Sequence, residues 1–173
     1  MPMVAAVLAE AGLTIGDLSA VAVTVGPGTF TGIRIGLAAA KGLALTAGIP
    51  VLGVLTTEAL AHAVPPGQRH GCRVLAAVDS KRAEIWVQTF DSDLAPLGPP
   101  AAMTPAQAAC CLDGRVVVAG DAAAAVLALR PDWVRADAPL DAGVVAGLAA
   151  AGNTHPPQPL YLRDADVTLP GVK

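Results

Sequence analysis

The sequence predicts an α/β fold made of two consecutive lobes, each built on a β-sheet that contains parallel strands. Apolar runs at 20–25 and 51–55 flank a segment of helical character at 31–47. This strand–helix–strand order is typical of a right-handed βαβ unit, whose two strands are parallel. Two further apolar runs, 73–79 and 84–90, are separated by a polar turn, which predicts an antiparallel hairpin and therefore a second sheet.

Capping residues support several of the helices. Gly12 favours a left-handed end to the first helix. Thr29 or Thr31 can cap the helix of the βαβ unit, and Asp121 and Asp141 precede two later helices. The remaining elements are expected in chain order: a helix at 3–11, a helix at 57–64, a short strand at 94–98, a helix at 105–112, a strand at 115–119, a helix at 122–129, a strand near Trp133 and a helix at 142–151.

The two halves of the chain resemble a repeat with a missing piece. The second half is predicted as β-β-β-α-β-α-β-α and the first only as α-β-α-β-α, so the first lacks three opening strands. Parallel strands are rarely left with an open edge, so either another chain covers this edge or the natural protein begins upstream of Met1. We expect an incomplete first lobe at 1–64, a linker at 65–72, a second lobe at 73–155 and a C-terminal arm at 156–173.

Composition excludes some classes of protein. The 173 residues are 54% hydrophobic and 14% charged, so the chain is expected to fold rather than to be disordered. Only 3% are aromatic, which predicts a core of small aliphatic side chains. The net charge of −3 has the wrong sign for holding phosphate backbones, so nucleic acid is not expected as a direct partner. Cys72, Cys110 and Cys111 are interpreted as reduced, buried thiols of a cytosolic protein.

A membrane helix is not expected either. The apolar stretch at 35–55 contains Lys41, which is costly in a bilayer, and Pro50 would break a spanning helix. The first residues contain no basic region of the kind that opens a secretory signal. The sequence therefore predicts a cytoplasmic protein.

The most informative segment is a glycine-rich turn that leads into a helix. Its glycines, from Gly26 to Gly32, are spaced neither as a dinucleotide fingerprint nor as a P-loop. Within the helix, Gly32, Gly36 and Ala40 recur at every fourth position, which favours close approach of another element along that face. Spacing alone does not decide whether this element belongs to the same chain or to another subunit.

The segment 26–42, G-P-G-T-F-T-G-I-R-I-G-L-A-A-A-K-G, resembles the signature of the TsaB (YeaZ) family. This family provides a bacterial subunit required for threonylcarbamoyladenosine modification of tRNA. Two weaker stretches are also similar to the family: the hairpin at 78–86, with its Asp-x-Lys-x-x-Glu-Ile-Trp-like pattern, and the tail at 159–163 followed by 167–170. The resemblance extends over the whole chain.

This resemblance implies an actin/Hsp70-like, or ribonuclease H-like, duplicated fold without the opening strands of the first lobe. The family normally begins with a strand and a hairpin before its first helix, whereas this chain begins at that helix. The implied function is that of a non-catalytic subunit that docks on a TsaD-like transferase and activates it, without catalytic residues, cofactor or metal. A TsaE-like ATPase joins the complex, homodimers can form, and tRNA is contacted only indirectly.

The resemblance also implies which residues contact the partner. Docking is expected through the helices at 3–11 and 31–47, so the small-residue face would meet another subunit, with Arg34 and Lys41 at its rim. The expected partner-interface residues are Gly32, Ile33, Gly36, Leu37 and Ala40. The residues of the family's signature turn are Gly26, Pro27, Gly28, Thr29, Phe30 and Arg34.

The alternative function is that of a weak actin-like nucleotide-binding phosphotransferase, which would use the turn at 26–32 with Asp79 or Asp121. Asp79 and Glu84 flank the hairpin turn, and we interpret them as a solvated turn with local charge pairs rather than an acid–base site. Asp121 is interpreted first as a helix cap. A third alternative is a degenerate fragment without function.

Other kinds of catalysis are not expected. No nucleophile elbow of the form G-x-S-x-G occurs in the sequence. The histidines do not have the spacing of metal ligands, so a metalloprotease is not predicted: His62, His70 and His155.

Overall fold

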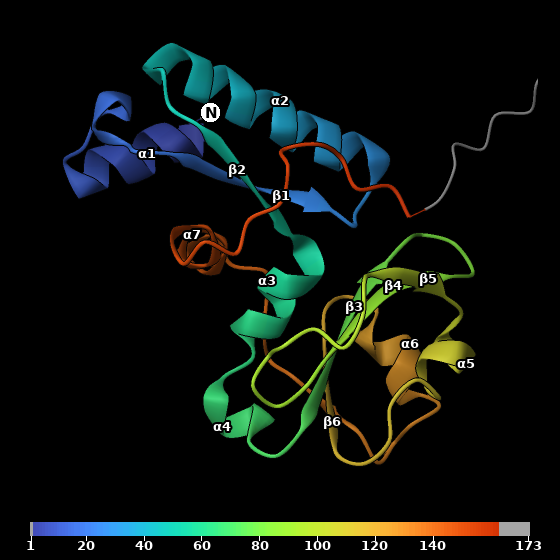
Figure 1. Ribbon diagram of the computed structural model, residues 1–173. Helices are drawn as coiled ribbons and strands as arrows, with labels where there is room; N and C mark the ends of the chain where they lie inside the picture. The colour runs from blue at the N-terminus through green and yellow to red at the C-terminus, as the bar shows by residue number, and fades with distance from the viewer. Residues whose placement is uncertain (1, 163–173) are drawn as a thin grey trace, which may run out of the picture.

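The computed structural model describes residues 2–162, which form two β-sheets with helices around them (Figure 1). Strands β1 (Val21–Gly26) and β2 (Val51–Leu55) form the first sheet and are parallel. The second sheet has the order β5-β4-β3-β6-β7, from β3 (Arg73–Asp79), β4 (Ile85–Phe90), β5 (Ala101–Met103), β6 (Val116–Ala119) and β7 (Val134–Arg135). The helices are α1 (Pro2–Ala11), α2 (Phe30–Ala47), α3 (Thr56–Ala63), α4 (Pro66–Arg69), α5 (Pro105–Ala108), α6 (Ala123–Leu127) and α7 (Ala142–Ala150).

The βαβ unit β1-α2-β2 forms as the sequence predicts. Helix α2 buries Ile33 and Leu37 at helical spacing, and these side chains pack against Val25 at the end of β1. Thr29 caps the first turn by accepting a hydrogen bond from the amide of Gly32, and Gly48 ends the helix with a left-handed backbone, φ +68°. The capping prediction for Thr29 is therefore confirmed, and α2 lies fixed over one face of the first sheet.

The predicted hairpin and the parallel pairing of the second sheet are also present. β3 pairs antiparallel with β4 and parallel with β6, and β6 pairs parallel with β7. All four residues of β6 are buried, as are five of the seven in β3. Small aliphatic side chains fill both faces of this sheet, with Phe90 and Trp133 as the buried aromatic residues. The expected core of small residues is thus observed.

Helices α3 and α7 lie where the two sheets meet: α3 packs on both sheets, and α7 packs on the first. Leu60 and Val64, on and just after α3, pack against β3 of the second sheet, near Val74. Val145 and Leu148 of α7 pack against the first sheet. Figure 1 shows α3 between the sheets and α7 beside the first. Because α7 lies within the predicted second lobe but covers the first sheet, the two lobes interlock, and their residue boundaries stay a prediction.

Each sheet contains a parallel pair of strands, as expected if the two halves of the chain are a repeat. β6 has β3 on one edge and β7 on the other, and it is fully buried. Within residues 2–162, β1 pairs only with β2, and four of its six residues are half-buried. Among these residues β1 therefore presents an open strand edge, and the outer edge of β2 is bridged at Gly53 by His155.

Some local predictions are wrong. The strand expected at 94–98 is a loop, because Asp91 accepts hydrogen bonds from the amides of Asp93 and Ala95 and turns the chain there. Leu94 adopts a left-handed backbone, φ +66°, which no regular strand allows. The third strand of the sheet is β5 instead.

The remaining boundaries differ by a few residues. The 3₁₀ turn at Ile15–Asp17 was not predicted, and α4 lies within the predicted linker. The helices expected at 105–112 and 122–129 are each shorter in the structure. The part of the C-terminal arm after residue 162, including most of the family-like tail, lies outside the described residues.

All three cysteines are free thiols, as predicted, but only Cys72 is buried: Cys111 is half-buried and Cys110 is exposed. Cys110 lies just after the short helix α5. Among residues 2–162, no helix combines the length and the apolar character that crossing a bilayer requires.

Candidate functional site

A cavity of about 550 Å³ lies between the two sheets and is lined by residues of both. Three turns surround it: the glycine-rich turn between β1 and α2, the hairpin turn between β3 and β4, and the junction after β6. The segment 135–140 forms another part of its wall. The cavity therefore brings together the turns that the sequence analysis singled out.

The glycine-rich turn is shaped by a close approach of the C-terminal segment. Gly26 has φ +123°, and a Cβ atom there would lie 2.7 Å from the carbonyl oxygen of Leu160. The amide of Leu160 donates a hydrogen bond to the carbonyl oxygen of Val25, at 2.8 Å. Glycine is required at position 26 because a side chain would collide with this segment.

The junction after β6 has a different role from the predicted one. The Oδ1 atom of Asp121 accepts a hydrogen bond from the amide of Asp79, at 2.7 Å, and so connects the ends of β6 and β3. The N-cap residue of α6 is Ala122 and has no side-chain cap. The prediction that Asp121 caps this helix is wrong, because the carboxylate binds a backbone amide that lies 42 residues earlier. Asp141, in contrast, caps α7 as predicted.

The hairpin turn holds a local ion pair. The carboxylate of Asp79 accepts hydrogen bonds from the side chain of Lys81, at 2.6 Å, and from its backbone amide, at 2.7 Å. These two hydrogen bonds lower the pKa of the Asp79 carboxyl, and the same pairing raises the pKa of Lys81. An ion pair within the turn thus stabilises it, which agrees with its interpretation as a solvated turn with local charge pairs.

The predicted nucleotide-proximal residues lie at this cavity. Asp79 and Asp121 line it together with Gly28, Thr29 and Gly32 of the signature turn. Within residues 2–162, no group of three His, Cys, Asp or Glu side chains is arranged to hold a metal ion. The cavity therefore offers carboxylates and glycine-rich backbone to a ligand.

Most of the small-residue face of α2 packs inside the molecule, whereas Gly32, at its start, is exposed and lines the cavity. Leu37 and Ala40 are buried, and a Cβ atom on Gly36 would lie 3.7 Å from the side chain of Val23 on β1. Ile33, another predicted interface residue, is also buried. The small residues therefore bring α2 close to its own sheet, and the face available to a partner is the opposite one, where Ile35 is exposed.

The signature turn continues into a cluster of side chains at the start of α2. The Nε atom of Arg34 donates a hydrogen bond to the hydroxyl of Tyr161, at 2.8 Å. The Arg34 guanidinium lies 3.7 Å from the centre of the Phe30 ring, and the Phe30 and Tyr161 rings stack with centroids 5.4 Å apart. Sequence reasoning placed Arg34 at the rim of an interface but missed this cluster, because Tyr161 lies 127 residues away.

The segment that carries Tyr161 is anchored along β2. His155 exchanges two backbone hydrogen bonds with Gly53, and its Nε2 atom lies 2.9 Å from a carboxylate oxygen of Glu58 on α3. A second cavity, of about 450 Å³, lies beside this pair. His155 therefore has a structural partner in the fold, and the segment holds α2, β2 and α3 together.

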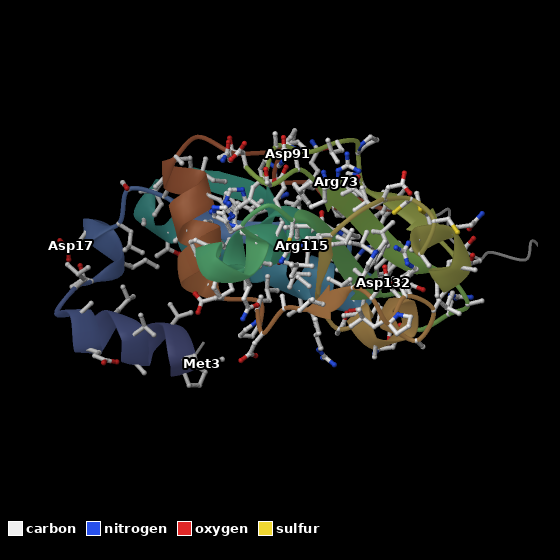
Figure 2. The ribbon with its side chains drawn as sticks, turned by 90° about the horizontal axis from the view of Figure 1, so that it is seen from below. Met3, Asp17, Arg73, Asp91, Arg115 and Asp132 are labelled. Atoms are coloured by element: carbon white, nitrogen blue, oxygen red, sulfur yellow. The ribbon has the colours of Figure 1, made fainter. Side chains whose placement is uncertain are left out.

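Helix α1 is apolar but has almost no contact with the rest of the chain. Its sequence is PMVAAVLAEA, and within it only Leu8 is even half-buried. Met3 is 82% exposed and Val7 is 64% exposed. Figure 2 shows this helix, with Met3 labelled, at the edge of the molecule. An apolar helix of this kind usually packs against a partner.

Two sheets joined by the helix α3, with a cavity between them at a glycine-rich turn, define an actin/Hsp70-like protein. The structure of YeaZ from Pseudomonas aeruginosa matches this chain with a TM-score of 0.77 and 28% sequence identity, and the match covers 93% of this chain and 81% of that one. The family model for TsaD, the tRNA N6-adenosine threonylcarbamoyltransferase, matches residues 1–109.

Sequence relatives identify the family. An uncharacterized protein of Mycobacterium tuberculosis is 37% identical over 167 residues, which are 95% of this chain and 74% of that protein. The tRNA threonylcarbamoyladenosine biosynthesis protein TsaB of Escherichia coli is 39% identical over 94 residues, which are 54% of this chain and 40% of that protein. The chain belongs to the TsaB (YeaZ) family.

Proposed function

We propose that this chain is a non-catalytic subunit of the cytoplasmic system that makes N6-threonylcarbamoyladenosine in tRNA, and that it docks on the TsaD-type transferase and activates it. Membership of the TsaB family supports the process. The observation that carries the docking step is the exposed apolar helix α1.

Burial of α1 by a partner is energetically favourable. Each Val or Met side chain that passes from water to a buried position stabilises an interface by about 1.5–3 kcal/mol. Met3 and Val7 are mostly exposed in the isolated chain, so most of this free energy is still available for binding. Leu13, which is 45% exposed just after the helix, extends the same apolar surface.

The outer face of α2 supplies a second apolar surface. Ile35 is 65% exposed and lies opposite the buried stripe of the helix, and Leu45, which is 85% exposed, lies on the flank of that stripe. Arg34 and Lys41 are exposed on the same helix, at the edge of this surface. An apolar centre with a charged rim is the usual composition of a protein–protein interface.

The test is chromatography with light scattering on this chain mixed with the transferase subunit of the same organism. A stable one-to-one complex is expected for the wild-type chain. Val7→Asp on α1 and Ile35→Asp on α2 should each prevent the complex, because each places a charge in the apolar surface. Leu129→Asp is the matched control, since Leu129 is 52% exposed in the turn after α6, away from α1 and α2. Absence of a wild-type complex with a folded chain would refute the proposal.

The proposal also includes a homodimer, which would form through the same apolar surface of α1 and α2. A homodimer that uses α1 and α2 would compete with the transferase, so added transferase should convert dimers into heterodimers. The TsaE-like ATPase joins the heterodimer, and tRNA reaches this subunit only through the complex. Wild-type homodimers that survive saturating transferase would show that the two contacts use different surfaces.

Nucleotide binding is the second candidate function, and the cavity between the sheets is the observation that favours it. Asp79 and Asp121 lie there with the signature turn. Calorimetry with ATP and magnesium on the isolated chain tests it. Stoichiometric binding that is lost in Asp79→Asn and Asp121→Asn, but kept in Asp132→Asn, would favour an enzyme; no heat of binding would favour the non-catalytic subunit.

A further inference from the structure

In the cluster at the start of α2, one edge of the Arg34 guanidinium has no hydrogen-bond partner among the described residues. The Arg34 side chain is held on one side by the Tyr161 hydroxyl and on one face by the Phe30 ring. Its two terminal amino groups, Nη1 and Nη2, make no hydrogen bond within residues 2–162. Phe30 is 51% exposed and Tyr161 is 42% exposed, so the cluster is accessible from solvent.

We propose that this Phe30–Arg34–Tyr161 cluster is the anchor by which the chain binds a carboxylate of the transferase-type partner. The proposal rests on the function proposed above and identifies the chemistry of the contact. A carboxylate can accept two parallel hydrogen bonds from Nη1 and Nη2, and such charge-assisted pairs are about twice as strong as hydrogen bonds between neutral groups.

The cluster is already in a binding conformation before a partner arrives. The hydroxyl of Tyr161 and the ring of Phe30 fix the Arg34 side chain, so little conformational entropy remains to be lost on binding. Aromatic residues and arginine are also the types that contribute most to binding free energy at interfaces. Tyr161 acts as a positioning residue, because it orients Arg34.

Charge indicates an acidic protein surface as the occupant. From Phe30 to Ala47, α2 contains Arg34 and Lys41 and no acidic residue. The whole chain has a net charge of −3, which is unfavourable for binding the many phosphates of RNA. A single carboxylate depends mainly on the charge of Arg34 beside it. The cluster also adjoins Ile35, in the apolar surface that the proposed function assigns to docking.

The experiment measures the dissociation constant between the full chain and the transferase by calorimetry, at about 50 and about 300 mM salt. Arg34→Gln should weaken binding by about tenfold or more and reduce its salt dependence, because the charged hydrogen bonds are lost. Arg34→Lys should be nearly as weak, since lysine has neither the fork nor the stacking. Tyr161→Phe should weaken binding about threefold, because the stack remains but Arg34 loses its hydroxyl partner.

Arg115→Gln is the matched control, since it changes the net charge equally at an exposed residue just before β6 of the second sheet. If Arg34→Gln affects binding no more than Arg115→Gln, the anchor is refuted while the proposed function stands. If the wild-type chain forms no complex, both fail. Unfolding curves of each variant should match those of the wild type, which excludes a folding defect.

Two other occupants are tested in the same series. Asp164 and Asp166 lie beyond the described residues, and a loss of binding in the doubly substituted Asp164→Asn, Asp166→Asn chain equal to that of Arg34→Gln would assign Arg34 to its own tail. Arg34-dependent binding of tRNA by the isolated chain would assign the cluster to RNA. Either result overturns the proposal.

Discussion

Gly53 occupies the tightest point between the C-terminal segment and the first sheet. A Cβ atom at this position would lie 2.6 Å from the carbonyl oxygen of His155 and 2.7 Å from a side-chain carbon of Val25. We expect Gly53→Ala to lower the free energy of unfolding by about 2–3 kcal/mol, the upper part of the range for overpacking, because a backbone oxygen cannot rotate away. For a chain of this length, Tm should fall by about 4–12 °C.

The assay is urea unfolding followed by circular dichroism, together with limited proteolysis of the segment 153–161. Gly42→Ala is the matched control: nothing lies within 4 Å of its Cβ position, and it is in the middle of α2. That variant should be more stable by about 0.5–1 kcal/mol, since alanine favours the helix. A Gly53→Ala chain as stable as the wild type would refute the tight packing described for this segment.

Three further predictions concern the core, the open sheet edge and the thiols. Thr57→Val should destabilise the chain by about 1–3 kcal/mol in urea unfolding, because it leaves the buried Gln88 side chain without its hydroxyl donor. In hydrogen exchange followed by NMR, the backbone amide of Thr24 should exchange faster than that of Val23. The Val23 amide points toward β2 in the parallel ladder, whereas the Thr24 amide points toward the open edge of β1. Cys110 should be alkylated by iodoacetamide before the other two cysteines, which are buried or half-buried, and burial raises the pKa of the half-buried thiol.

Local sequence signals predict the elements that positioned the site. The strands of the βαβ unit and of the hairpin were predicted to within a residue or two, because their apolar runs are bounded by glycine, proline and polar turns. Thr29 and Asp141 could be predicted as caps because a cap contacts amides only two or three residues away. Such interactions are contained within a short window of sequence.

Contacts between distant segments could not be predicted in this way. Asp121 has the sequence context of a cap, but in the fold its carboxylate binds an amide at the end of β3 and not one in the first turn of α6. The Arg34–Tyr161 hydrogen bond depends on the path of a segment that has no regular secondary structure. Neither partner can be identified without the three-dimensional arrangement of the two sheets.

The small-residue stripe of α2 shows how a correct physical inference can be assigned to the wrong partner. Glycine and alanine at every fourth position do indicate close packing, and the structure places Gly36 and Ala40 toward β1. Substituting a large residue at Gly36 would therefore disturb the first sheet and would not report on a partner. Because the small inner face seats α2 close to the sheet, the larger side chains of its outer face, Ile35 among them, are the ones that stay exposed, and variants there can separate docking from folding.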